Sequence, residues 1–281
     1  MLCDVEKCTG CFACFLACKD EHVGNGHGKY AASAAEGQQW INLKEIEYGT
    51  GDKVKIDYIP LLCQHCENPA CAGGAPDGAV YTRQDGAVII DPEKAKGVKS
   101  IVKNCPYGVV FWNEALELPQ KCTLCAHMLD SGANTTRCAE CCPTGALVFG
   151  DLDDPESEIA KLTMRYGENL NVYKPQFGTA PRVLYHALPK PFIAGEAAFS
   201  DRPGEPACNV RVSLTCIRTG KVYEAVTDAV GDFCFKRLDA GEKFTLRFDS
   251  PGYSLEECEV NTNAARNLGL IELKKNEIDR V

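Results

Sequence analysis

Four cysteines near the start of the chain have a spacing that suits iron–sulfur ligation. They form the run Cys8-x2-Cys11-x2-Cys14-x3-Cys18. In bacterial [4Fe–4S] proteins this spacing lets three thiolates of one tight loop meet three irons of a cluster, while the fourth cysteine binds a different cluster. The proline that usually follows the fourth cysteine is replaced by Lys19, which alters the turn but removes no ligand.

A second run, further along the chain, is a stretched version of the first. It reads Cys122-x2-Cys125-x12-Cys138-x3-Cys142 and is followed by Pro143. Exchange of the fourth cysteines between the two runs predicts two complete sites. The first site contains Cys8, Cys11, Cys14 and Cys142. The second contains Cys18, Cys122, Cys125 and Cys138, so residues 1–150 are expected to form one folded unit.

Two incomplete groups lie between these runs. One is Cys63-x2-Cys66-x4-Cys71, and the other retains Cys105 alone, before Pro106. By the same exchange, Cys105 completes a third site with Cys63, Cys66 and Cys71. A fourth site would need cysteines at positions occupied by Ala75, Ala95, Val98 and Ile101. We therefore predict three [4Fe–4S] clusters and one deleted site, whose volume apolar side chains partly fill.

The other cysteines and the histidines of the loops are not expected to bind iron. Six cysteines are interpreted as buried thiols that pack as small apolar groups: Cys3, Cys141, Cys208, Cys216, Cys234 and Cys258. Pro143 makes Cys142 a better ligand than Cys141. His65 and His127 are expected to neighbour a cluster or to be exposed, because each site already has four cysteines. Structural zinc is disfavoured, since it rarely uses interlocked Cys-x2-Cys-x2-Cys runs.

Composition limits the classes of partner and compartment. The chain has 281 residues, 18 of them Cys, and a net charge of −9, with 45% hydrophobic and 25% charged residues. A chain of this length with so many cysteines favours cluster ligation over a secreted disulfide framework. The acidic charge disfavours nucleic acid as a partner. The sequence shows neither an apolar membrane span nor a signal-peptide pattern, so we expect a cytoplasmic protein.

Short strands, helices and loops are expected to position the cysteines. Strands are predicted at Val54–Ile59, Ala79–Thr82 and Val88–Asp91, with a turn at Gln84-Asp85-Gly86 between the last two. The order of the groups indicates an α+β fold over residues 1–150, made of tandem nested ferredoxin-like cluster domains. Residues 151–191 resemble a connecting segment that begins with a helix near Glu158 and is kept extended by four prolines.

Residues 192–281 have a different pattern. Apolar residues alternate with polar ones, as at Val210, Val212 and Leu214, and turn signals such as Ser250-Pro251-Gly252 separate the segments. This pattern predicts an antiparallel β-sandwich or barrel. No catalytic constellation is visible in it, which favours a docking or structural module.

The first 190 residues resemble the iron–sulfur subunits of molybdopterin oxidoreductases of the dimethyl sulfoxide reductase family. The motifs that carry the resemblance are KCTGCFACFLAC (7–18), LCQHCENPAC (62–71), NCPYG (104–108) and KCTLC…RCAECCPTGA (121–146). The C-terminal part resembles the prealbumin-like or carboxypeptidase-regulatory β-domain. Its carrying motifs are VTDAVGDFCF (226–235) and SPGYSL (250–255).

This resemblance implies a hetero-oligomer with a large catalytic subunit. That partner would bind molybdenum in a bis-(molybdopterin guanine dinucleotide) cofactor, and the present chain would supply clusters and no catalytic residue. The deleted cluster and the added β-domain are similar to the small subunits of transhydroxylases, which move hydroxyl groups between polyhydroxybenzenes. Two alternatives stay open: the electron-transfer subunit of a respiratory-type molybdenum reductase or dehydrogenase, and a free polyferredoxin. The substrate, the cluster potentials and the number of heterodimers do not follow from the sequence.

Overall fold

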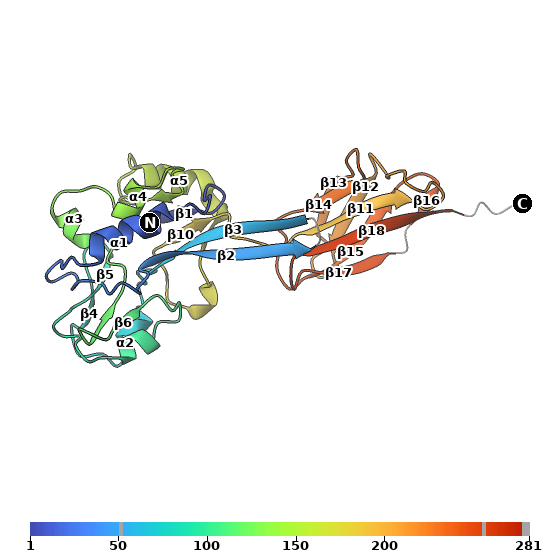
Figure 1. Cartoon of the computed structure of the whole chain (residues 1–281). Helices are drawn as coiled ribbons and strands as arrows, with labels where there is room; N and C mark the ends of the chain where they lie inside the picture. Colours follow the sequence, from blue (N-terminus) through green and yellow to red (C-terminus); the bar gives the residue numbers. More distant parts are fainter. Residues whose placement is uncertain (51–52, 255–256, 277–281) are drawn as a thin grey trace, which may run out of the picture. The chain divides into compact units, whose positions relative to one another are not determined.

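Figure 1 shows the chain as a computed structural model, which describes residues 1–50, 53–254 and 257–276. The chain divides into two compact units. Unit 1 comprises Met1–Glu45 and Asp57–Leu188, and unit 2 comprises Ile46–Ile56 and Pro189–Val281. The two-stranded sheet of β2 (Ile41–Thr50) and β3 (Lys53–Leu62) therefore supplies residues to both units.

Unit 1 is built from short elements, because the cysteine loops occupy much of its chain. Its helices are α1 (Ala13–His22), α2 (Ser100–Lys103), α3 (Ala126–Asp130), α4 (Arg137–Glu140) and α5 (Glu158–Tyr166), with 3-10 turns η1 (Ala70–Ala72), η2 (Gly167–Asn169) and η3 (Pro175–Phe177). Two antiparallel pairs accompany them: β4 (Val80–Thr82) with β5 (Val88–Ile90), and β6 (Phe111–Asn113) with β7 (Leu118–Gln120). The mixture of helices and strands agrees with the α+β expectation, and the predicted hairpin around Asp85 is confirmed. Among the described residues, no helix has both the length and the apolar character required to cross a membrane.

A four-stranded sheet joins the two ends of unit 1. Its order is β8 (Leu147–Val148), β1 (Leu2–Asp4), β10 (Leu184–His186) and β9 (Leu170–Val172). β1 runs parallel to β10 and antiparallel to β8. Residues 151–188 contribute β9 and β10 to this sheet and lie in unit 1. These strands have three residues each, too few to show a periodicity in the sequence.

Asp4 ties this sheet to helix α5. Its buried carboxylate accepts a hydrogen bond from the Tyr166 hydroxyl at 2.6 Å and lies 3.0 Å from His186 Nδ1. The rings of Tyr166 and His186 stack with their centroids 3.8 Å apart. Burial by itself would raise the pKa of Asp4, but these two hydrogen bonds hold that pKa below its ordinary value. Three segments that are far apart in sequence are thus fixed by one side chain.

Unit 2 consists of two four-stranded sheets around one apolar core. The first has the order β14 (Asp232–Phe235), β11 (Ile193–Phe199), β18 (Arg266–Lys275) and β16 (Tyr253–Ser254). The second has the order β13 (Val222–Val226), β12 (Arg211–Cys216), β15 (Lys243–Asp249) and β17 (Cys258–Asn261). Ile193 and Phe233 from the first sheet share a buried cluster with Leu214 and Leu246 from the second.

One strand pair of unit 2 departs from the expected antiparallel arrangement. β11 and β18 run parallel, while the other described pairs of these two sheets are antiparallel. Alternation of apolar and polar residues determines which side chains face the core, but it carries no information on strand direction. The alternation therefore predicted two packed sheets, but it could not predict that β11 and β18 run parallel.

Replacement of Asp4 tests the connection between the sheet and α5. We expect Asp4→Asn to lower the free energy of unfolding by about 1–3 kcal/mol, because the partly buried Tyr166 and the buried His186 lose a charged partner. Urea unfolding of the purified protein at neutral pH measures the change. The exposed Asp77→Asn is the matched control and should stay within about 0.5 kcal/mol of the wild type. Equal losses of unfolding free energy in Asp4→Asn and Asp77→Asn would contradict the role of Asp4 in connecting the sheet to α5.

The same carboxylate predicts a pH dependence. The pKa of Asp4 is lower in the folded protein than its ordinary value of 3.8. Its contribution to stability is therefore present above that value and is lost as the pH falls through the lower folded-state pKa. Below that pH the wild type and Asp4→Asn should converge in stability.

Candidate metal centres

The cysteines of the first predicted site lie around one cavity of unit 1. Cys8, Cys11, Cys14 and Cys142 all line it, together with Leu43, Pro60, Pro143 and Leu147. Cys14 is on α1, whereas Cys142 lies between α4 and β8. Cys141 is not among the lining residues; its Sγ donates a hydrogen bond to the Cys138 carbonyl at 3.5 Å. Of the two adjacent cysteines, Cys142 therefore faces the cavity and Cys141 does not, as the position of Pro143 indicated.

A second cavity is lined by the third predicted set. Cys63, Cys66, Cys71 and Cys105 face it, along with Pro69, Pro106, Tyr107 and Val110. This cavity contains about 330 Å³ of space outside protein atoms, and the first contains about 300 Å³, in both cases with the opening to solvent included. Two cavities of similar size, each with four thiols from loops distant in sequence, are suited to groups of the same kind.

The remaining set, Cys18, Cys122, Cys125 and Cys138, is also brought together. Burial, followed by the electrostatic effects of Cys18 and Cys138, raises the pKa of Cys122. Burial, followed by the effects of Cys138 and Cys125, raises the pKa of Cys18. Leu124 N–H lies 3.4 Å from Cys122 Sγ, and the Thr136 hydroxyl lies 3.3 Å from Cys138 Sγ. These thiols are therefore close enough to interact and have hydrogen-bond partners at their sulfur atoms.

Three cysteine loops share one backbone conformation. In the pairs Cys8–Cys11, Cys63–Cys66 and Cys122–Cys125, the residue before the second cysteine has a positive φ: 71° at Gly10, 43° at His65 and 53° at Leu124. The turn directs this residue's N–H toward the preceding thiol, as at His65, whose N is 3.5 Å from Cys63 Sγ. A side chain in this region costs roughly 1–2 kcal/mol, and such strain is characteristic of functional sites. A glycine, which favours positive φ and can be recognised in the sequence, occupies this position in the first loop only; the other two loops have His65 and Leu124 there.

Burial opposes ionisation of these thiols. It raises the pKa of Cys71 to about 11 and the pKa of Cys14 and Cys125 to about 12. Cys142 differs: burial again acts against ionisation, but backbone N–H groups of residues 144, 146 and 147 and the Thr144 hydroxyl lower its pKa. Metals bind the thiolate, and a bound cation deprotonates the thiol that coordinates it. The sets are thus suited to a cationic iron centre.

The four positions assigned to a deleted site also come together. Ala95 and Ile101 are fully buried in one apolar cluster, and Ala75 and Val98 pack against it. Cys71 and Cys105 belong to the same cluster, so it borders the second cavity. The structure thereby brings the four apolar replacements into one place, as the interpretation of a lost site requires. Ile101 lies on α2, where a ligand loop would otherwise run.

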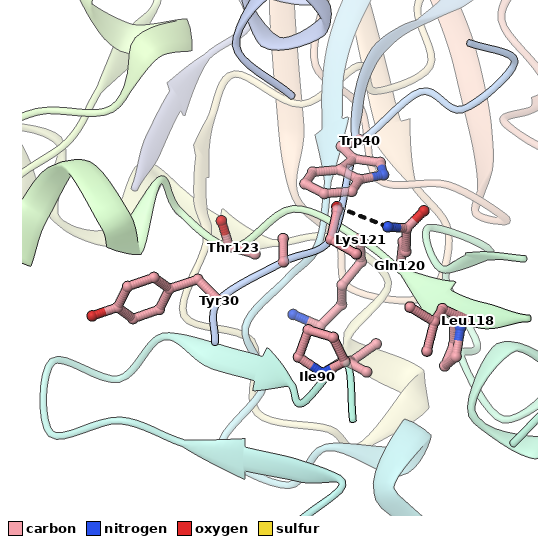
Figure 2. Close-up of a pocket in the computed structure, with 11 residues that line it drawn as sticks. Tyr30, Trp40, Ile90, Leu118, Gln120, Lys121 and Thr123 are labelled. Carbon is pink, nitrogen blue, oxygen red and sulfur yellow. Dashed lines mark hydrogen bonds between the residues drawn. The ribbon is translucent and has the colours of Figure 1, made fainter. Parts of the chain in front are cut away.

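Lys121 is a functional candidate that sequence reasoning missed. Its side chain is 2% exposed, and it lines the cavity of Cys63, Cys66, Cys71 and Cys105. Its Nζ donates to the Val88 carbonyl and, at 3.1 Å, to the Cys122 carbonyl. Within residues 1–50, 53–254 and 257–276, no carboxylate forms an ion pair with it. Figure 2 shows the lysine beside a neighbouring pocket that Trp40, Ile90 and Gln120 also line.

A buried ammonium group without an anionic neighbour is costly. An iron–sulfur cluster with four thiolates carries net negative charge and would supply the missing counter-charge in this cavity. Both the four thiols and the buried ammonium group of Lys121 therefore suit an iron–sulfur cluster in this cavity. The sequence gives no signal for this role, because Lys7 also stands directly before a Cys-x-x-Cys pair and is exposed.

The two histidines of the cysteine loops have different surroundings. His65 is fully buried, and its Nδ1 accepts a hydrogen bond from Val88 N–H at 2.9 Å. Burial lowers its pKa, so the ring is neutral and carries its proton on Nε2, which has no partner among the described residues. His127 is half-buried and lies 2.9 Å from Glu21 Oε1. Neither lines a four-cysteine cavity.

The expectation that the other six cysteines are buried thiols is wrong for two of them. Cys3 and Cys216 are buried and Cys141 and Cys208 are partly buried, but Cys234 and Cys258 are exposed. Cys234 lies on edge strand β14 between Phe233 and Phe235, which face the core, so alternation turns its thiol outward. Cys258 begins edge strand β17. All 18 cysteines are free of disulfides.

Comparison with known proteins places these features in a family. Residues 54–152 match the family model described as a 4Fe-4S dicluster domain. The chain is 40% identical to the pyrogallol hydroxytransferase small subunit of Pelobacter acidigallici, over 97% of this chain and 98% of that protein.

Two further relatives match a smaller part of the chain. A tetrathionate reductase subunit of Salmonella typhimurium is 33% identical over 69% of this chain and 74% of its own. The arsenate respiratory reductase iron-sulfur subunit of a Shewanella species is 31% identical over 66% of this chain and 94% of its own.

Cysteine substitutions test how the cavities are completed. Cys105→Ala should remove about four irons per chain, because one thiol of the Cys63, Cys66 and Cys71 set is lost, and should leave the other two sets occupied. Anoxic iron and sulfide analysis with EPR spectroscopy measures the loss. Unchanged iron content would refute the exchange of fourth cysteines.

Adjacent cysteines provide a matched pair for the first cavity. Cys142→Ala should remove the centre of Cys8, Cys11 and Cys14, whereas Cys141→Ala should retain its iron, because only Cys142 faces that cavity. The same iron analysis distinguishes the two variants. Iron loss in Cys141→Ala alone would reverse the assignment.

Proposed function

We propose a function for this chain on the premise that it belongs to the iron–sulfur electron-transfer subunits of dimethyl sulfoxide reductase-family molybdenum enzymes. Within that family, we propose that it is the small subunit of a transhydroxylase that converts pyrogallol to phloroglucinol. The share of the chain that each relative matches supports the transhydroxylase over the reductases. The pyrogallol hydroxytransferase subunit matches 97% of the chain, whereas the two reductase subunits match 69% and 66%.

The chain would hold three [4Fe–4S] clusters. Cys8, Cys11, Cys14 and Cys142 bind the first, Cys18, Cys122, Cys125 and Cys138 the second, and Cys63, Cys66, Cys71 and Cys105 the third. Each bound cluster takes up and releases one electron. The protein's part is to fix four thiolates around each one, to direct N–H groups at their sulfurs and to limit water around them. Support comes from the two four-cysteine cavities and from the mutual proximity of the remaining set.

The chemistry on the substrate would belong to a large partner subunit that holds molybdenum in a bis-(molybdopterin guanine dinucleotide) cofactor. The present chain contributes no catalytic residue in this proposal. Movement of a hydroxyl group between polyhydroxybenzenes consumes no electrons overall, so it does not need a continuous relay to an external acceptor. Replacement of the fourth site by Ala75, Ala95, Val98 and Ile101 is consistent with that requirement.

The main alternative is a respiratory-type molybdenum reductase or dehydrogenase. The similarity to subunits of tetrathionate and arsenate reductases, over 69% and 66% of this chain, supports this alternative. A free polyferredoxin is less well supported, because unit 2 would have no role in a carrier without a partner. For unit 2 we propose the prealbumin-like or carboxypeptidase-regulatory fold, on its two motifs and its two-sheet core. The domain limits 1–150, 151–191 and 192–281 and the cytoplasmic location stay predictions.

Activity without an electron acceptor tests the proposed reaction. The complex that co-purifies with this chain under anoxic conditions should convert pyrogallol to phloroglucinol with no added oxidant or reductant. Chromatographic product analysis measures the conversion. Inactivity of a complex that contains molybdenum and all its clusters would overturn the transhydroxylase and favour the reductase alternative, as would steady reduction of a quinone.

Lys121 gives an electrostatic test of the third cluster. Lys121→Met should lower the reduction potential of the cluster of Cys63, Cys66, Cys71 and Cys105, because loss of a buried positive charge disfavours the added electron. The matched control is Lys103→Met, which removes the same charge from an exposed lysine two residues before Cys105. Water and salt screen Lys103, so its shift should be much smaller. Anoxic redox titration monitored by EPR measures both, and equal shifts would contradict the prediction.

A further inference from the structure

Three of the five histidines of the chain gather beside one glutamate, outside the cysteine cavities. Glu21 and His22 end helix α1, His27 lies in the loop that follows, and His127 lies on α3. Glu21, His27 and His127 each offer a ligand atom, and these atoms lie within 4.8 Å of one another. All three side chains are partly buried. None of the three cysteine sets includes these residues.

The imidazole rings of His27 and His127 both lie at hydrogen-bond distance from oxygen atoms of Glu21. His127 Nε2 lies 2.9 Å from Glu21 Oε1, and His27 Nε2 lies 3.1 Å from the Glu21 carbonyl oxygen. Their rings are stacked, with centroids 3.6 Å apart and planes 13° apart. A carboxylate oxygen and two ring nitrogens therefore converge on one small region.

Arg137 fixes the orientation of the carboxylate. Its Nε donates to Glu21 Oε2 at 2.9 Å, which leaves Oε1 facing His127. The same guanidinium group also binds Glu140 at 2.6 Å, so it is held from both sides. Outer partners that orient a carboxylate or imidazole in this way are usual around metal ligands.

Unpartnered ring nitrogens provide an independent indication of a missing ligand. His22 is 3% exposed, and its Nδ1 has no hydrogen-bond partner among the described residues. The Nδ1 of His127 is also buried and unpartnered, but the nitrogen of this ring that faces Glu21 is Nε2, so the indication comes from His22. The His22 ring contacts both other rings, at centroid distances of 4.9 Å to His27 and 5.5 Å to His127. Buried polar atoms normally find a partner, so these atoms call for an explanation.

We propose that Glu21, His27 and His127 bind a zinc ion, with His22 beside them as a candidate fourth ligand. Two imidazoles and one carboxylate form a donor set that zinc uses in proteins, at bond lengths of about 2.0–2.2 Å. Tetrahedral ligands at such lengths are about 3.3 Å apart, so the side chains close slightly around the ion and the stacked rings turn. Gly24 and Gly28, both with positive φ and open surroundings, flank His27 and allow its loop to adjust.

A zinc ion at this place would connect helix α1 with the start of α3. Glu21 lies three residues after Cys18 on α1, and His127 lies two residues after Cys125, at the start of α3. The zinc ion therefore joins the two elements that carry cysteines of the same set. Without metal, Glu21, His127 and Arg137 form a hydrogen-bonded network, and experiment can separate these two states.

Zinc binding by the intact complex tests the proposal. The complex is purified anoxically, dialysed to remove loose metal, titrated with Zn²⁺ and analysed for zinc and iron by mass spectrometry. His27→Gln should bind one zinc fewer per chain than the wild type, or bind it at least about tenfold more weakly, with iron unchanged. The matched control is Asp20→Asn, which neutralises the exposed carboxylate adjacent to Glu21 and should retain the zinc.

X-ray absorption at the zinc edge identifies the ligands. Nitrogen and oxygen neighbours at about 2.0–2.1 Å, lost in His27→Gln, would support the site. Sulfur neighbours at about 2.3 Å would show zinc in a cysteine cavity and overturn it. Equal zinc in the wild type and His27→Gln would overturn it as well, and would leave the hydrogen-bonded network as the role of these residues. Neither readout depends on activity, so failure here does not bear on the transhydroxylase.

Discussion

Each cysteine set of unit 1 is completed by a residue from a distant part of the chain. Cys142 faces the loop of Cys8–Cys14, and Cys105 faces the loop of Cys63–Cys71. Bringing four thiols to one centre therefore requires the surrounding fold to close on itself. The sheet of β8, β1, β10 and β9 meets this requirement, because it joins residues near both ends of unit 1. Short helices and strands suffice, since the loops between them carry the ligands.

Charge and backbone conformation are adjusted to the same centres. Buried Lys121 lacks a carboxylate partner in the described part of the chain, and most of the cysteine thiols are too buried to ionise readily without a cation. Left-handed residues at His65 and Leu124 hold N–H groups toward sulfur at a cost in conformational energy. These features are unfavourable in isolation and become favourable when clusters occupy the cavities. The cationic iron core stabilises the thiolates, and the complete cluster, with its four thiolates, is anionic and accepts N–H groups. The four positions Ala75, Ala95, Val98 and Ile101 carry no ionisable side chain, in agreement with their interpretation as a lost site.

Much of the candidate site was predictable, because ligand spacing is a local property. The runs beginning at Cys8, Cys63 and Cys122 and the choice of Cys142 over Cys141 followed from position alone. The sandwich of unit 2 followed from alternation in segments such as Val210–Leu214. The role of Lys121 was not predicted, since a lysine in sequence is usually exposed and only its neighbours reveal its burial. The exposure of Cys234 and Cys258 depends on edge strands that the sequence does not identify.

The sequence by itself led to the proposed iron ligands, to the apolar residues at the positions of a fourth set, and to the alternation that turns side chains of unit 2 toward its core. These are consequences of residue type and spacing along the chain. Only the tertiary structure decided the parallel pairing of β1 with β10 and of β11 with β18, the tie of Asp4 to Tyr166 and His186, and the meeting of Glu21, His27 and His127. Such contacts join residues up to 182 positions apart. They form because burial and hydrogen bonding across the fold outweigh any local preference.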